Sequence, residues 1–265
     1  MTRLASILLT LLAHCVGAQP LTLNDPALAD APSQLPDVPG WVWDLDASVN
    51  ITNASGAAPG NGDKIKIWED KANSQTFQQL YSTEQPTFKT VAVAGYPALY
   101  FSGAPGNNEN LTNFNGVSYP QPITVYAVVS NTWDAIGTPE ELLDSGPGGR
   151  CIVYNANVPT QAITAYAGSI IQGPTGSGPA AGAGWTVVTV VFNGASSVIR
   201  TNGVQLASGD VGTNGFVNGW IAGAYTSGAN GWKGHLTRMR FYNGAHSVGQ
   251  QQTVEGLFKN RYATP

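Results

Sequence analysis

The residues best placed to do chemistry lie near the end of the chain. Arg238, Arg240 and Tyr242 alternate along an apolar stretch, so on a β-strand they project from one face, and His235 lies nearby in the opposite phase. β-Elimination of an acidic polysaccharide needs a cation to neutralise a uronate carboxylate and a His or Tyr to remove the adjacent proton. These four residues therefore form a candidate catalytic set for a polysaccharide lyase. The competing interpretation is a solvated strand face, which we favour.

Acidic residues gather in one cluster, the segment Glu140-Glu141-Leu142-Leu143-Asp144. Glycoside hydrolysis requires two carboxylates on opposite sides of the scissile bond. We expect this cluster to lie on the surface, in a helix or at the edge of a turn, rather than to form such a pair. A hydrolase is therefore disfavoured, and we expect catalysis to be absent.

Aromatic residues offer a second kind of site. Sugars present apolar C–H faces on which exposed Trp or Tyr rings stack, while polar side chains bond the hydroxyl groups. Four aromatic residues lie in or beside polar Gly/Asn-rich segments, and with one arginine they form the candidate ligand-binding set: Trp133, Trp220, Tyr225, Trp232 and Arg240. For each ring the alternative is packing in the core. Trp43 and Trp68 lie within strands and are expected in the core.

No cofactor or metal is predicted. Calcium is the ion that loop carboxylates and amides could hold, but no ligand spacing is evident among the available residues, Asp63, Asp70, Asn108 and Asp210. His235 and His246 are too few for a zinc site. Cys151 lies in an apolar run and is expected to be a buried, inert thiol, with an intermolecular disulfide as the alternative.

The start of the chain has the pattern of a secretory signal peptide over residues 1–18, with a positive end, an apolar run and a small-residue cleavage site. The protein is therefore expected to be secreted and extracellular, with no membrane insertion. The formal net charge of −4 gives no electrostatic reason to bind nucleic acid or anionic membrane. Asn50, Asn53 and Asn110 each begin an N-glycosylation sequon. Each is a candidate glycosylation site in a eukaryotic host, and a sequon that is used places its asparagine on the surface.

The rest of the chain consists of short apolar strands separated by Gly, Pro and Asn turns. Residues 19–40 are expected to form an extended N-terminal arm, and 41–265 a single domain. Asn202-Gly203 between two apolar runs predicts a tight hairpin, since both residues tolerate positive φ. Ser247 and Gln250 form a capping box before a C-terminal helix, which is expected to lie as a lid over one edge or end of the sandwich. Its apolar stripe is expected in the core: Val254, Leu257, Phe258 and Tyr262.

From Trp41 to Ala263 the sequence resembles the concanavalin A-like lectin/glucanase superfamily, in its laminin-G-like form. The resemblance is carried by Leu45-Asp46-Ala47, Trp68-Glu69-Asp70, Pro97–Gly103 and the closing run Gly256–Ala263. It implies an all-β, two-sheet antiparallel jelly-roll sandwich with one C-terminal helix, and a framework role for Asp46 and Trp68. The chain departs from the family pattern at Arg238, where relatives often carry an acidic residue.

These observations predict a secreted, non-catalytic, lectin-like domain whose partner is a glycan or another extracellular surface polymer. Sandwiches of this type host lectins, hydrolases, lyases and adhesion domains, so the resemblance does not select among functions. The first alternative is an extracellular polysaccharide lyase that acts on an acidic glycan. The second is a structural or self-assembling surface protein, which is favoured by the low charge and by Cys151, the one cysteine left after removal of the predicted signal peptide with Cys15. The sequence leaves the oligomeric state open.

Overall fold

The structure is a computed structural model that describes residues 37–71, 75–103, 109–131, 139–145, 150–156, 161–179, 184–221 and 231–265. The predicted signal peptide and most of the predicted arm lie outside these residues. None of the described helices is long and apolar enough to span a membrane.

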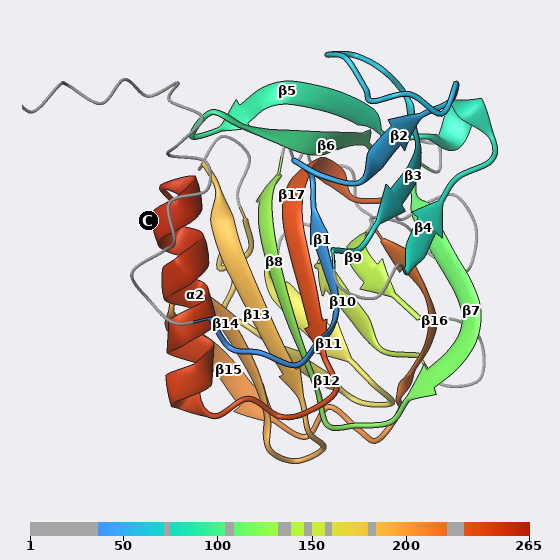
Figure 1. The fold of residues 1–265 in the computed structure, drawn as a ribbon. Helices are drawn as coiled ribbons and strands as arrows, with labels where there is room; N and C mark the ends of the chain where they lie inside the picture. Colours follow the sequence, from blue (N-terminus) through green and yellow to red (C-terminus); the bar gives the residue numbers. More distant parts are fainter. Residues whose placement is uncertain are drawn as a thin grey trace, which may run out of the picture. The chain divides into compact units, whose positions relative to one another are not determined.

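The described chain is mostly β-strand, which confirms the predicted all-β class, and its strands form two antiparallel sheets (Figure 1). Sheet A contains β1 (Trp41–Asp46), β5 (Thr87–Val93), β6 (Tyr96–Ser102), β8 (Ile123–Asn131), β13 (Thr186–Phe192), β14 (Ser197–Thr201), β15 (Val204–Gly209) and β17 (Lys233–Tyr242). Its order is β15-β14-β13-β8-β17-β6-β5, and β1 also pairs with β17.

Sheet B contains β2 (Ile51–Asn53), β3 (Ile65–Glu69), β4 (Thr76–Gln78), β7 (Leu111–Tyr119), β9 (Glu140–Asp144), β10 (Ile152–Asn155), β11 (Ile163–Tyr166), β12 (Ile170–Gln172) and β16 (Phe216–Ile221). Its order is β12-β11-β10-β9-β16-β7-β4-β3-β2. A short 3₁₀ turn, η1 (Ser82–Glu84), precedes β5.

The main core joins the inward faces of the two sheets. The Trp43 ring of sheet A stacks on Phe241 with 5.0 Å between centroids and meets Phe77 of sheet B edge-on at 5.3 Å. Trp43 and Trp68 are both buried, as predicted, and Trp68 Nε1 donates a hydrogen bond of 3.1 Å to the Asp46 carbonyl. This bond ties β3 to the end of β1, so the framework role expected for both residues agrees with their positions.

A second, smaller core lies on the outer face of sheet A, beneath helix α2 (Val248–Tyr262) (Figure 1). The predicted capping box is present, because Ser247 and Gln250 bond each other's backbone N–H groups. The predicted apolar stripe is buried and packs against β8 and β13. The helix therefore lies on the face of this sheet, not over an edge or end of the sandwich as expected. There Glu255 also pairs with Arg200 at 2.8 Å.

The predicted hairpin is present between β14 and β15. Asn202 and Gly203 have φ of 49° and 87°, the left-handed values that a tight hairpin turn requires. Asn202 Oδ1 also accepts a 2.8 Å hydrogen bond from Val187 N, which fixes the turn against the end of β13.

Candidate functional site

A β-bulge in β17 decides which side chains of the last strand share a face. Residue 237 is the extra one, since Leu236 pairs with Val129 of β8 whereas Arg238 already pairs with Val128. Leu236 and Met239 consequently both point into the main core. The bulge brings His235 to the same outer face as Arg238, so the expectation that it lies in the opposite phase is wrong.

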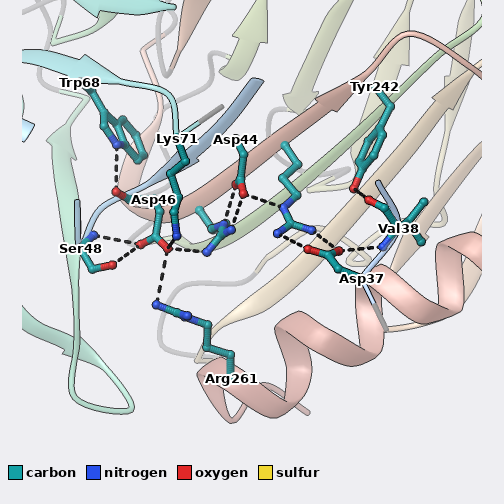
Figure 2. Close-up of polar contacts among 11 residues, drawn as sticks. Asp37, Val38, Asp44, Asp46, Ser48, Trp68, Lys71, Tyr242 and Arg261 are labelled. Carbon is teal, nitrogen blue, oxygen red and sulfur yellow. Dashed lines mark hydrogen bonds and ion pairs between the residues drawn. The ribbon is translucent and has the colours of Figure 1, made fainter. Parts of the chain in front are cut away.

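Arg238 is held by two buried carboxylates of β1 (Figure 2). Its guanidinium binds Asp44 through two hydrogen bonds, one of them 2.7 Å from Nε to Oδ1, and it also bonds Asp46. Arg261 of α2 approaches Asp46 to 3.5 Å. Arg238 is therefore a fully paired cation between sheet and helix.

Arg240 is also buried and paired, mostly through contacts with the segment that precedes β1. Its two terminal nitrogens lie 2.6 and 2.8 Å from the Asp37 carboxylate, its Nε lies 3.0 Å from Asp44, and its guanidinium lies 4.8 Å from the centre of the Trp41 ring. Tyr242 donates a 3.1 Å hydrogen bond to the Val38 carbonyl (Figure 2). The last residues of the predicted arm thus pack on sheet A.

The electrostatics of this network are those of a closed ion cluster. Burial opposes ionisation of Asp46, but the charges of Arg238 and Arg261 and two hydrogen bonds from Ser48 outweigh it and lower its pKa. Burial likewise disfavours charged Arg238, yet Asp44 and Asp46 raise its pKa. Arg238, Arg240 and Tyr242 are buried and paired, so the favoured expectation of a solvated strand face is wrong. They also offer no accessible cation to a uronate, which removes them as lyase residues. Arg240 is removed from the ligand-binding set for the same reason.

The predicted aromatic platform is only partly described. Trp232 is fully buried in the main core, so it cannot stack on a ligand. The cause is the chain path: Gly231 bridges to Glu141 of sheet B whereas Lys233 begins β17 of sheet A, so Trp232 lies where the chain crosses between the sheets. Trp133 and Tyr225 lie outside the described residues, and for Trp220 the structure describes only the backbone, which pairs with Asp144.

The acidic cluster forms strand β9, and all five of its residues are buried, which corrects the expectation of a surface helix or turn edge. A second bulge is responsible for the arrangement of its charges. Val153 of β10 pairs with Leu143, but the next residue, Tyr154, pairs with Glu141, so Leu142 is the extra residue. Because of this bulge, Glu141 and Asp144 lie on one face of the strand, the outer face of sheet B.

Arg150 joins these two carboxylates. It binds Asp144 with two hydrogen bonds, of 3.1 Å from Nε and 2.5 Å from a terminal nitrogen, and that nitrogen lies 3.6 Å from Glu141 Oε2. The hydrogen bond with Asp144 raises the pKa of Arg150 against the effect of burial, and the charges of both acids add to it. The Arg150 side chain stays 29% exposed, unlike the two acids, so it can contact a ligand.

Two tyrosines complete this surface, which we call the β9–β12 face. In the register of β9 to β12, Asp144 pairs with Ile152 and Ile152 with Tyr166, while Glu141 pairs with Tyr154. Tyr154 and Tyr166 are half-buried, so their rings remain partly accessible. Burial and the charge of Glu141 raise the pKa of Tyr154, against the effect of a side-chain hydrogen bond with Thr164.

The sequence pattern around Arg150 indicates part of this face, but not its acidic residues. Tyr154 and Tyr166 each follow a short apolar run, and Arg150 directly precedes the first of these runs. The link between them and the acids depends on the bulge at Leu142, which strand alternation does not reveal.

The remaining predicted positions are scattered. Among the described residues no group of three or more His, Cys, Asp or Glu side chains is arranged to hold a metal ion. Asp63 and Asp210 accept hydrogen bonds from nearby backbone N–H groups, Asp70 accepts one from Gln75, and Asn108 lies outside the described residues. Asn50 is exposed.

The other two sequon asparagines are engaged in the fold. Asn53 is half-buried and donates to Asp63. Asn110 is 7% exposed and accepts a 3.0 Å bond from Gln79, so it lacks the surface position that a used sequon requires.

No protein-family model matches the sequence, and no curated protein matches it. Solved structures do match. Domain 4 of a GH43 extracellular arabinanase from Geobacillus stearothermophilus, in complex with arabinotriose, is 15% identical with a TM-score of 0.54, and the match covers 80% of this chain and 96% of that domain. Trypanosoma rangeli sialidase in complex with sialic acid is 16% identical with a TM-score of 0.56, over 87% of this chain but 36% of the sialidase.

The binding domain of Paraclostridial Mosquitocidal Protein 1 is 11% identical with a TM-score of 0.57, and the match covers 85% of this chain and 55% of that one. At these identities the likeness concerns the fold alone. It supports an all-β protein of the sandwich kind.

Proposed function

We propose that this protein is a secreted, non-catalytic carbohydrate-binding domain with a concanavalin A-like jelly-roll fold, and that it binds glycan on the β9–β12 face. The observation that carries the proposal is the grouping of Arg150, Glu141 and Asp144 with the half-buried rings of Tyr154 and Tyr166 on that face. Tyrosine rings stack on the apolar faces of sugars, and the guanidinium and carboxylates bond their hydroxyl groups.

Three of the predicted ligand-binding aromatic residues are close in sequence to the strands of this face or belong to its neighbouring strand. The segment that contains Trp133 directly precedes β9, and the segment that contains Tyr225 directly follows β16, whose Trp220 pairs with Asp144. We propose that these three residues extend the platform. The arabinanase domain was solved with arabinotriose and the sialidase with sialic acid, which supports a search among glycans.

Binding of a glycan panel tests the proposal. We expect wild-type protein to bind at least one oligosaccharide in isothermal titration calorimetry, with Tyr166→Ala and Trp220→Ala each weakening binding about three- to tenfold through loss of one stacking contact. Tyr81→Ala, at a tyrosine that is 70% exposed and distant in sequence from this face, is the matched control and should bind as wild type. Failure to bind any glycan, or unchanged binding by both variants, would overturn the proposal.

Secretion has its own test. After expression in a host that processes signal peptides, the protein in the medium should begin at Gln19 by mass spectrometry, because the small-residue cleavage pattern ends at Ala18. Retention of residues 1–18 in the cell-associated protein would contradict it.

A further inference from the structure

A second cluster of polar and aromatic side chains lies on the other sheet, on the outer face of sheet A. Its members come from five consecutive strands or their ends: Trp185 before β13, Ser130 of β8, His235 of β17, Tyr100 of β6 and Lys89 of β5. The backbone register places His235 directly between Ser130 and Tyr100. We call this set the sheet A row.

The row is assembled around the imidazole of His235. Its Nδ1 lies 3.1 Å from Ser130 Oγ, and its ring centre lies 4.9 Å from that of Tyr100 and 5.8 Å from that of Trp185. The Lys89 ammonium lies 5.6 Å from the centre of the Tyr100 ring. The bulge in β17 is what turns His235 toward this face.

The polar ends of the row face solvent without protein partners. Within the described part of the chain, the Trp185 indole N–H, the Tyr100 hydroxyl, His235 Nε2 and the Lys89 ammonium have no hydrogen bond or ion pair, and none of these atoms is fully buried. All five residues are half-buried, so their rings and stems are held in place. This contrasts with Arg238 and Arg240 nearby, whose charges are already paired.

These unpaired groups are mostly donors. Indole and ammonium donate only, and when Ser130 donates to Nδ1 the Nε2 of His235 carries the ring hydrogen and donates too. Burial and the positive charge of Lys89 lower the pKa of His235, so at neutral pH Lys89 is the cation of the row. Hydrogen-bond donors grouped around one ammonium are complementary to an anionic oxygen group. The flanking Tyr100 and Trp185 rings are complementary to the apolar face of a sugar.

We infer that the sheet A row is a binding site for an anionic sugar residue, one that carries a carboxylate or a sulfate. Lys89 and the N–H groups of Trp185 and His235 contact the anion, and the aromatic rings contact the sugar. This site is separate from the β9–β12 face, because it lies on the other sheet, and it does not depend on glycan binding there.

The test compares three tetrasaccharides by calorimetry: an alginate one with carboxylates, a carrageenan one with sulfates, and neutral cellotetraose. Support requires at least one anionic tetrasaccharide to bind about tenfold more tightly than the neutral one. The tighter of the two anionic ligands shows whether the site prefers a carboxylate or a sulfate. Lys89→Gln should weaken that binding about tenfold, the effect of losing one charge-assisted contact. Lys66→Gln, which removes the same charge from a half-buried lysine of sheet B, is the control and should bind as wild type.

Two further measurements separate a site from a nonspecific charge effect. Trp185→Phe keeps an aromatic ring but removes the N–H donor, and it should also weaken anionic binding while leaving the unfolding temperature nearly unchanged. The pKa of His235, followed by NMR, should rise when the anion binds. The inference would be overturned if neutral and anionic sugars bind equally, if none of them binds, or if Lys89→Gln and Lys66→Gln have the same affinity. Tyr166→Ala tests a different proposal, glycan binding on the β9–β12 face.

Discussion

Glu141 and Asp144 project from the same face of β9, although strict alternation would put residues three apart on opposite faces. The bulge at Leu142 produces this arrangement, and Arg150 then lies against both carboxylates. Two buried acids on one face need a nearby cation to remain ionised. The relationship therefore makes Arg150 part of the fold as well as of the proposed glycan site.

The coupling of Arg150 to Asp144 is the first prediction. Arg150→Gln and Asp144→Asn should each lower the free energy of unfolding by about 1–3 kcal/mol, because each leaves a hydrogen-bonded charge without its partner. The double variant should lose less than the sum of the two, since neither partner is then left alone. Urea unfolding of the four proteins measures this, and strictly additive losses would show that the pair is not coupled.

The buried network of β17 gives a second prediction, with a control built into it. Arg238→Met removes the cation that bonds Asp44 and Asp46, and it should cost about 3–5 kcal/mol of unfolding free energy because two buried carboxylates lose their main partner. Lys71→Met removes a cation 3.6 Å from the same Asp46, but that lysine is 38% exposed, so the cost should stay below about 1 kcal/mol. Similar losses in both variants would contradict the closed network.

The pH dependence of stability is a third prediction. The pKa of Asp46 is lowered from its ordinary value of 3.8, so the unfolded state binds a proton at this site before the folded state does. Its contribution is therefore complete above about pH 5 and is lost as the pH falls through the lowered pKa. Asp46→Asn should be less stable than wild type at pH 7 and should lose less stability between pH 4 and pH 2, as measured by denaturant unfolding. An unchanged acid slope would exclude Asp46 as a source of acid sensitivity.

The thiol of Cys151 gives a fourth prediction. Burial, with the nearby charge of Asp144, raises its pKa to about 12, and its Sγ donates a 3.0 Å hydrogen bond to the Asn214 carbonyl. Native protein at pH 8 should therefore resist iodoacetamide, because the reactive species is the thiolate, whereas protein in urea should be alkylated. Mass spectrometry reads out both states. Rapid labelling of the native protein, or a Cys151-linked dimer on a non-reducing gel, would favour the self-assembling alternative.

Glycosylation supplies a fifth prediction. When the protein is expressed in a eukaryotic host, Asn50 should carry a glycan because its side chain is exposed. Asn110 should not, because it is 7% exposed and hydrogen-bonded to Gln79. Glycopeptide mass spectrometry after digestion assigns the sites. Asn50→Gln should remove the modified species, with Asn110→Gln as the control that leaves it unchanged, and a folded protein with a glycan on Asn110 would contradict the burial of that side chain.

Local patterns in the sequence determined much of the secondary structure. Runs of β-branched residues between Gly and Asn turns predicted the strands, and Asn202-Gly203 predicted the hairpin, because turn conformation depends on adjacent residues. The capping box of Ser247 and Gln250 predicted where α2 begins for the same reason. Burial of Trp43, Trp68 and Cys151 followed from their apolar surroundings.

The sites were decided by tertiary structure. Arg238 meets Asp44 and Asp46 only when β1 pairs with β17, which lie at opposite ends of the chain, and no local pattern encodes that pairing. Trp232 is buried because the chain crosses between sheets at that residue. The bulges at Leu142 and residue 237 shift the alternation by one, so Glu141 joins Asp144 and His235 joins the sheet A row. A bulge is set by pairing with neighbouring strands, so a strand read alone gives the spacing of its side chains but not the face they share.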